Sequence, residues 1–207
     1  MSRNSSGWRD PISAVLAAAG AALVYGLAVH TPAGRSVDGA VLGLVAGWAG
    51  TPDTSAVAAA LGVIRGALPF LLAAAVGVLG MIGVARRRWR GVVAAAVAIP
   101  CAIASSLVLR DLLLSRPSEL AHPVYAHNTF PSTHVTAVAA LCLAAWWLRP
   151  TSWNDTVTAY SAGLIVLLAA VASVATHAHR PSDTLGSVFL VAAWGAMTVY
   201  ALRLRPD

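Results

Sequence analysis

Charged residues are scarce in this chain, and lysine is absent. Of the 207 residues, 11% are charged and 58% are hydrophobic, whereas about a quarter of the residues of an average soluble domain are charged. All 14 basic residues are arginine. This composition excludes an ordinary soluble domain and predicts a protein embedded in a membrane.

Cysteine is nearly absent as well. Cys101 and Cys142 are the two cysteines, and each falls inside an apolar segment. The chain therefore has neither a disulfide framework nor the cysteine spacing of a zinc site. We interpret both as small apolar residues buried in membrane helices.

Long apolar segments dominate the rest of the sequence. About 20 apolar residues are needed to cross a bilayer as a helix, and the alternation of a membrane β-strand is missing. The pattern predicts an all-α polytopic membrane protein, a bundle of six transmembrane helices forming a single domain over residues 1–207. The expected spans are 12–29, 67–85, 92–109, 135–148, 157–176 and 184–202. The first apolar core, about 18 residues long, exceeds the length expected of a cleaved signal, so we expect it to be retained.

The positions of the arginines predict the orientation. With six crossings, nine arginines fall on one side and five on the other, and the richer side is expected in the cytoplasm. Both termini should then be cytoplasmic, in the cell membrane. We interpret residues 86–90 as a cytoplasmic stop signal, and we favour this over a site for anionic lipid or nucleic acid. The richer set is Arg3, Arg9, Arg86, Arg87, Arg88, Arg90, Arg149, Arg203 and Arg205, and the other is Arg35, Arg65, Arg110, Arg116 and Arg180.

Residues 30–66 are harder to assign. Turn-like residues 30–35, a glycine-rich stretch at 39–49 and a break at 51–54 predict short interfacial helices. Thr54 is a candidate N-cap for a helix over 55–66. A continuous helix from 54 to 85 would be about 48 Å long, so part of it would have to kink or project from the bilayer.

Three polar clusters lie at the predicted outer ends of these spans. One runs from Arg110-Asp111 to Arg116-Pro117, and the second is Pro131-Ser132-Thr133-His134. The third is His177-Ala178-His179-Arg180-Pro181-Ser182-Asp183. Because all three are predicted on one side of the membrane, we expect them to converge on one pocket that faces outward.

The residue types in these clusters suit an anionic ligand. Pro131 and Pro181 are each suited to the first turn of a helix, and a helix N-terminus attracts anions through its free N–H groups. Arginine binds phosphate through paired hydrogen bonds. Charged groups in a membrane protein also require partners or a water-filled cavity. We therefore expect phosphate to be the ligand bound by Ser132, Thr133, Arg110, Arg116 and Arg180.

Two histidines suggest chemistry rather than binding alone. His179 and Asp183 are four residues apart, so the carboxylate can accept a hydrogen bond from one ring nitrogen and leave the other as a nucleophile. His134 would then act as the general acid that protonates the leaving oxygen.

Together these motifs resemble the type 2 phosphatidic acid phosphatase superfamily. The resemblance spans about residues 105–190 and includes the order and spacing of Arg116-Pro117, Pro131-Ser132-Thr133-His134 and His179-x-x-x-Asp183. It implies a six-helix membrane enzyme that dephosphorylates lipid phosphates and shares its active site with vanadium haloperoxidases. It also implies that His179 becomes phosphorylated, that Asp183 orients it, that His134 protonates the leaving group, and that Arg116, Ser132 and Thr133 bind the phosphate. No metal or other cofactor is implied.

Three positions depart from the family pattern. Leu109 occupies the place of a motif lysine, with Arg110 one position later, which on a helix rotates the side chain by about 100°. Thr133 stands where the family usually has glycine, and its Cβ restricts the approach of the backbone to phosphate. Ser173 stands where the family usually has arginine, and Arg180 is a candidate to compensate.

The sequence therefore predicts an integral membrane phosphatase acting on a lipid phosphate or diphosphate at the outer face. A non-catalytic lipid-phosphate binding or transport protein, and a lipid phosphotransferase, remain open as alternatives. A metal or haem site at His177-x-His179 is less favoured, and Asp111 and Glu119 are expected to pair with nearby arginines. We expect no nucleic-acid partner, and the identity of the lipid and the oligomeric state stay open.

Overall fold

The protein is a bundle of helices. The computed structural model describes residues 11–51, 53–117 and 128–203, and within them it contains helices and no strand, as the sequence predicts. The elements are α1 (Pro11–His30), α2 (Pro32–Ala49), α3 (Ala56–Ala85), α4 (Trp89–Val108), the π-helical turn η2 (Leu109–Leu113), α5 (Thr133–Leu148), α6 (Asp155–Ala175) and α7 (Pro181–Leu202).

Five of these stretches are long and apolar enough to cross a membrane. They are α1, α3, α4 continued by η2, α6 and α7. The remaining predicted span, the fourth along the chain at 135–148, corresponds to α5, an apolar helix of only 16 residues. The described residues thus support a multi-pass membrane protein with five candidate spans and one shorter apolar helix.

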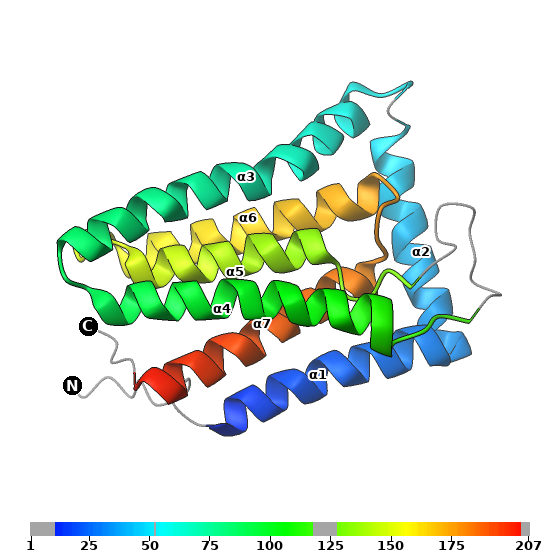
Figure 1. Ribbon diagram of the computed structural model, residues 1–207. Helices are drawn as coiled ribbons and strands as arrows, with labels where there is room; N and C mark the ends of the chain where they lie inside the picture. The colour runs from blue at the N-terminus through cyan, green and yellow to red at the C-terminus, as the bar shows by residue number, and fades with distance from the viewer. Residues whose placement is uncertain (1–10, 52, 118–127, 204–207) are drawn as a thin grey trace.

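The short helix α5 lies at the centre of the bundle. It contacts α3, α4, α6 and α7, and Figure 1 shows it running alongside α4 and α6. Most of its residues are buried, from Val135 near its start to Leu148 at its end. Its length is about 24 Å at 1.5 Å per residue, less than the roughly 30 Å of a hydrocarbon core. Neighbouring helices rather than lipid therefore cover most of the apolar surface of α5.

Helix α2 lies across one end of the bundle, whereas the other helices run roughly side by side (Figure 1). The expected turn at 30–35 is wrong, because residues 32–49 form a single helix of 18 residues. Thr31 caps its start by accepting a hydrogen bond from the N–H of Gly34, and Gly50 ends it with a φ of 77°. Packing explains its continuity despite the glycines, since Ala46 and Ala49 are buried against the bundle.

Helix α3 begins one residue later than predicted and does not stop at 66. Ser55, not Thr54, is the N-cap, and its Oγ accepts a hydrogen bond from the N–H of Ala58 at 3.4 Å. Thr54 instead shares a hydrogen bond with the hydroxyl of Thr51. The helix then runs through Pro69 for 30 residues, about 45 Å, so it is longer than a bilayer core is thick.

The described arginines of the two predicted sets lie at opposite ends of the bundle. The α3–α4 turn lies at the end where α1 begins and α7 finishes (Figure 1), and Arg88 there donates to the carbonyl oxygen of Arg149 at 2.7 Å. The other end carries η2 and the start of α5 and α7. Arg3, Arg9 and Arg205 lie outside the described residues, and the side of the membrane on which each end lies stays a prediction.

Candidate active site

The three polar clusters meet at the end of the bundle that α2 crosses. Arg116 Nη2 lies 2.7 Å from Asp183 Oδ1, which joins the first cluster to the third. Arg110 Nη1 lies 3.1 Å from Thr133 Oγ1, which joins the first to the second. The N–H of Ser132 donates to the carbonyl oxygen of Asp183 at 3.2 Å. Contacts between residues as far as 67 positions apart in the sequence thus form one site.

Asp183 is the most enclosed group of this site, with none of its side chain exposed. Its Oδ1 accepts from Arg116, and its Oδ2 accepts from the hydroxyl of Thr129 at 2.6 Å and from the N–H of Arg180 at 2.9 Å. His179 Nδ1 lies 3.5 Å from the same Oδ2. A buried carboxylate is stable only when it is paired and hydrogen-bonded, and these contacts also prevent it from rotating.

His179 lies in the tight turn between α6 and α7. The N–H groups of Ala178 and His179 both donate to the carbonyl oxygen of Ser173, and His177 adopts a φ of 55°. The turn buries His179 to 6% exposure and directs Nδ1 toward Asp183. The other ring nitrogen, Nε2, is therefore the one left for a substrate.

His134 is exposed and is the second residue of α5. The first four N–H groups of a helix have no partner within it, and those of Thr133 and His134 bind no acceptor in the described part of the chain. Arg65, His179 and Arg110 all act electrostatically on the His134 imidazole, Arg65 most strongly. The start of α5 therefore presents an imidazole and two N–H donors among positive charges.

Arg110 reaches the second cluster although it is one position beyond the family's lysine. Its Nε and Nη2 bind the carboxylate of Asp111 at 2.7 and 3.0 Å, which confirms the predicted local pairing of Asp111. Its Nη1 donates to Thr133 Oγ1, which also accepts from the hydroxyl of Ser106 at 3.1 Å. The hydroxyl of Thr133 thereby holds the guanidinium in place.

Arg116 is deeply buried. Its side chain is 3% exposed, and one of its terminal nitrogens is committed to Asp183. It also borders an open cavity of about 450 Å³, together with Arg110, Asp111, Leu114, Ser115 and Asn128. Arg116 is thus placed both to neutralise Asp183 and to face a ligand in this cavity.

The start of α7 differs from the predicted second anion site. Asp38 of α2 already accepts hydrogen bonds from the N–H and the hydroxyl of Ser182, at 2.8 and 3.0 Å. Arg180 Nη1 lies 3.9 Å from the same carboxylate. A side chain of the protein therefore occupies the place that we predicted for a bound anion at α7, whereas the described start of α5 keeps free N–H donors.

The two prolines also differ from each other. Pro181 is the first residue of α7, as expected. Pro131 precedes the N-cap of α5, because Ser132 has an extended backbone and its Oγ accepts from the N–H of Val135. The buried ring of Phe130 packs on α7 where residue 186 is glycine, and a Cβ there would lie 2.2 Å from the ring.

Four further polar residues of this site were missed by sequence reasoning. Thr129 binds Asp183, and the amide of Asn128 donates to the carbonyl oxygens of Arg110, Leu114 and Phe130. Asp38 and Arg65 come from α2 and α3. A signal existed for Arg65, since a charge within a membrane helix is rare and usually functional, whereas nothing in the sequence pointed to the other three.

The remaining candidate ligands do not assemble. Within residues 11–51, 53–117 and 128–203, no three His, Cys, Asp or Glu side chains cluster as metal ligands would. His30 packs edge-on against the ring of Tyr25. The predicted pairing of Glu119 with nearby arginines lies outside the described residues.

Comparison with known proteins points to the same family as the motifs. No curated protein and no solved structure matches this chain significantly. The model of the PAP2 superfamily matches residues 100–206, which is more than half of the chain and contains η2, α5, α6, α7 and the three polar clusters. The chain therefore belongs to the PAP2 superfamily.

Proposed function

We propose that this protein is an integral membrane phosphatase that hydrolyses a lipid phosphate or diphosphate through a phosphohistidine on His179. The observation that carries the proposal is the buried Arg116–Asp183–His179 arrangement opposite the exposed His134. A histidine oriented by a carboxylate is a nucleophile, and a second histidine beside free N–H donors is a proton donor at an anion site.

The proposed reaction has two displacement steps. Nε2 of His179 attacks phosphorus, the bond from phosphorus to the leaving oxygen breaks, and that oxygen takes a proton from His134. Asp183 stabilises the positive charge that forms on His179. His134 then removes a proton from water, which attacks the phosphohistidine and releases inorganic phosphate.

Positive charge near the phosphoryl group supplies most of the stabilisation in such a reaction. Arg110, Arg116 and the N–H groups of Thr133 and His134 are placed to offset charge on its oxygens. Ser132 holds the start of α5 in place through its capping bond. Arg180 directly follows His179 in the sequence, and its guanidinium lies beside the carboxylate of Asp38.

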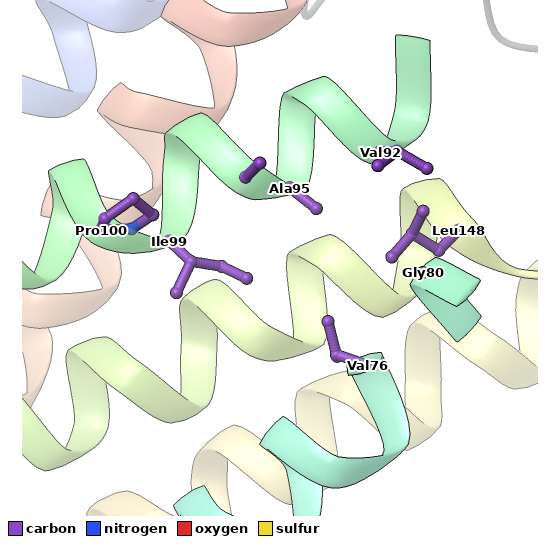
Figure 2. Close-up of a pocket in the computed structure, with 8 residues that line it drawn as sticks. Val76, Gly80, Val92, Ala95, Ile99, Pro100 and Leu148 are labelled. Carbon is purple, nitrogen blue, oxygen red and sulfur yellow. The ribbon is translucent and has the colours of Figure 1, made fainter. Parts of the chain in front are cut away.

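The bundle also carries an apolar groove away from the polar clusters. It lies between α3 and α4 over the end of α5, has a volume of about 260 Å³, and is lined by Val76, Gly80, Val92, Ala95, Ala96, Ile99, Pro100 and Leu148 (Figure 2). Leu148 ends α5 whereas His134 lies at its start, about 21 Å away along the helix axis, so the groove is separate from the candidate active site. The five long apolar helices support a membrane lipid as the substrate. The arginine distribution supports an outward-facing site.

The test is phosphate release by the purified protein in detergent with excess EDTA. Substrates would include phosphatidic acid, phosphatidylglycerol phosphate, a polyprenyl diphosphate and a polyprenyl-linked sugar phosphate. We expect His179→Ala to abolish release while the protein stays folded, and His177→Asn, in the same turn, to retain it. Activity that survives in His179→Ala, or that requires added metal, would refute the mechanism.

Orthovanadate separates an enzyme from a binding protein, because it mimics the five-coordinate transition state. Tight vanadate binding together with turnover supports the phosphatase. Binding of lipid phosphate without turnover of any substrate in the panel would instead indicate a binding or transport protein.

A further inference from the structure

Arg65 is the one charged residue of α3, a helix that is otherwise apolar from Ala56 to Ala85. It lies nine residues past the start of the helix, about 14 Å along its axis. A charged side chain at such a place is costly unless it meets a partner or a water-filled cavity. The guanidinium of Arg65 is therefore expected to have a negatively charged partner.

The packing of α3 directs Arg65 toward the candidate active site. Leu61, four residues earlier, packs against Ala172 and Ala175 of α6. Leu68, three residues later, packs against a cluster that includes Val135 of α5. Residues three and four apart share a helix face, so Arg65 lies between these contacts, level with the start of α5. The electrostatic interaction of Arg65 with the His134 imidazole agrees with this position.

Arg65 differs from the other arginines of the site in its partners. Arg110 pairs with Asp111, Arg116 with Asp183, and Arg180 lies beside Asp38. For Arg65, the described residues provide no carboxylate, and its buried Nε has no hydrogen-bond partner among them. Arg65 is therefore a partly buried positive charge near His134 that no described carboxylate neutralises. An anionic ligand would supply the missing negative charge.

We propose that Arg65 binds the leaving group of the substrate and thereby makes the enzyme prefer lipid diphosphates over lipid monophosphates. This inference rests on the proposed function, in which His134 protonates the leaving oxygen. With a monophosphate that oxygen leaves as a neutral alcohol, which offers no charge to a guanidinium. With a diphosphate it leaves as part of a lipid monophosphate, which keeps negative charge beside His134.

In the reaction of a diphosphate, His179 Nε2 forms a bond to the terminal phosphorus, and the bond from that phosphorus to the bridging oxygen breaks. The bridging oxygen leaves on the lipid monophosphate with the proton of His134, and Arg65 binds the unesterified oxygens of that product. Water then releases the terminal phosphate from His179.

A pair of substrates with the same tail tests the proposal. Values of kcat/KM for farnesyl diphosphate and farnesyl monophosphate would be measured for the wild type, Arg65→Gln, Arg65→Lys and the control Arg86→Gln. Arg86 is an exposed residue at the far end of α3. We expect Arg65→Gln to lower kcat/KM roughly 10- to 100-fold for the diphosphate and by less than about threefold for the monophosphate. Arg65→Lys should recover part of the loss, and Arg86→Gln should change neither value.

Equal losses with both substrates would overturn the proposal, since Arg65 would then bind the transferred phosphoryl group. Unchanged kcat/KM values for both substrates would also overturn it. Elution as a single species and an unchanged Tm would show that each variant is folded.

Binding of inorganic anions provides a readout that does not depend on turnover. Pyrophosphate should raise the Tm of the wild type more than phosphate does, and Arg65→Gln should remove this difference. Should the wild type hydrolyse no lipid, the proposed function fails, while the pyrophosphate preference still tests Arg65 as an anion-binding residue. An equal effect of the two anions on the wild type would contradict the inference.

Discussion

Thr133 shows how one side chain adjusts this site. The family usually has glycine at this position, yet here a hydroxyl accepts hydrogen bonds from both Ser106 and Arg110. Ser106 is fully buried, so its hydroxyl requires a partner. Thr133 therefore links α4 and η2 to the start of α5 and fixes the guanidinium that stands one position away from the family's lysine.

Replacing Thr133 by Val should release Arg110 without changing the shape of the residue. We expect a several-fold higher KM for a lipid phosphate and a loss of about 1 kcal/mol in the free energy of unfolding, because a buried donor loses its acceptor. Thr133→Ser keeps the hydroxyl and should behave like the wild type in both measurements. Wild-type KM in Thr133→Val would show that Arg110 needs no such anchor.

Helix α2 is joined to the site by Asp38. This carboxylate accepts both hydrogen bonds of Ser182 and lies beside Arg180, so it holds the first turn of α7, which carries Asp183. Burial raises the pKa of Asp38 above its ordinary value of 3.8, although the hydrogen bonds from Ser182 act in the opposite direction. The ionised carboxylate is therefore less stable here than in the unfolded chain.

Two substitutions at Asp38 separate hydrogen bonding from charge. Asp38→Ala leaves the buried N–H and hydroxyl of Ser182 without acceptors and should cost about 1 to 3 kcal/mol of unfolding free energy. Asp38→Asn can accept from the N–H and donate to the hydroxyl, so it should cost much less. Thermal unfolding in detergent would measure both.

The pH dependence of the same variants follows from the raised pKa. A carboxyl that binds its proton more tightly in the folded state stabilises the fold below pH 3.8, and this contribution is lost as pH rises through the folded pKa. Compared with Asp38→Asn, the wild type should lose unfolding free energy as pH rises from 3.8 through the folded pKa of Asp38. Above that pKa the difference between the two proteins should stay constant. A difference in Tm that does not change with pH would contradict the assignment.

The bundle as a whole places all the proposed chemistry at one end. The exposed apolar residues of α2, including Leu44 at 74% and Trp48 at 69% exposure, suit a helix lying in the membrane interface. At the other end, Trp146 stacks under Arg149, and tryptophan prefers that depth. Both ends thus carry interfacial anchors, and the arginine excess predicts which one faces the cytoplasm.

Labelling with a membrane-impermeant maleimide would test this orientation. In a variant with Cys101 and Cys142 replaced by Ala, a single cysteine would be introduced at Ser36 of α2 or at Thr151 between α5 and α6, both exposed positions. We expect labelling of Ser36→Cys in intact cells and of Thr151→Cys only after lysis. The reverse pattern would place the candidate active site in the cytoplasm.

The membrane class, the helical fold, the family and the three converging clusters were all predictable from the sequence, because each depends on local properties. Hydrophobic length determines which stretches become membrane helices, and short motifs such as Pro131-Ser132-Thr133-His134 carry their chemistry in consecutive residues. Boundaries were predicted less well where two signals competed. Ser55 rather than Thr54 caps α3, and the glycines of α2 did not end that helix, because packing against the bundle outweighed their low helix propensity.

Tertiary structure decided which charges far apart in the sequence pair and which stay available. The pairing of Asp111 with Arg110 could be predicted because the two residues are neighbours. The sequence did not show that Asp183 lies beside Arg116 or that Asp38 lies beside Arg180. Tertiary structure also brought Arg65 to His134 from a helix that no motif covers. Pairing depends on contacts between residues far apart in the chain, and Coulomb interactions fall with distance in space rather than in sequence.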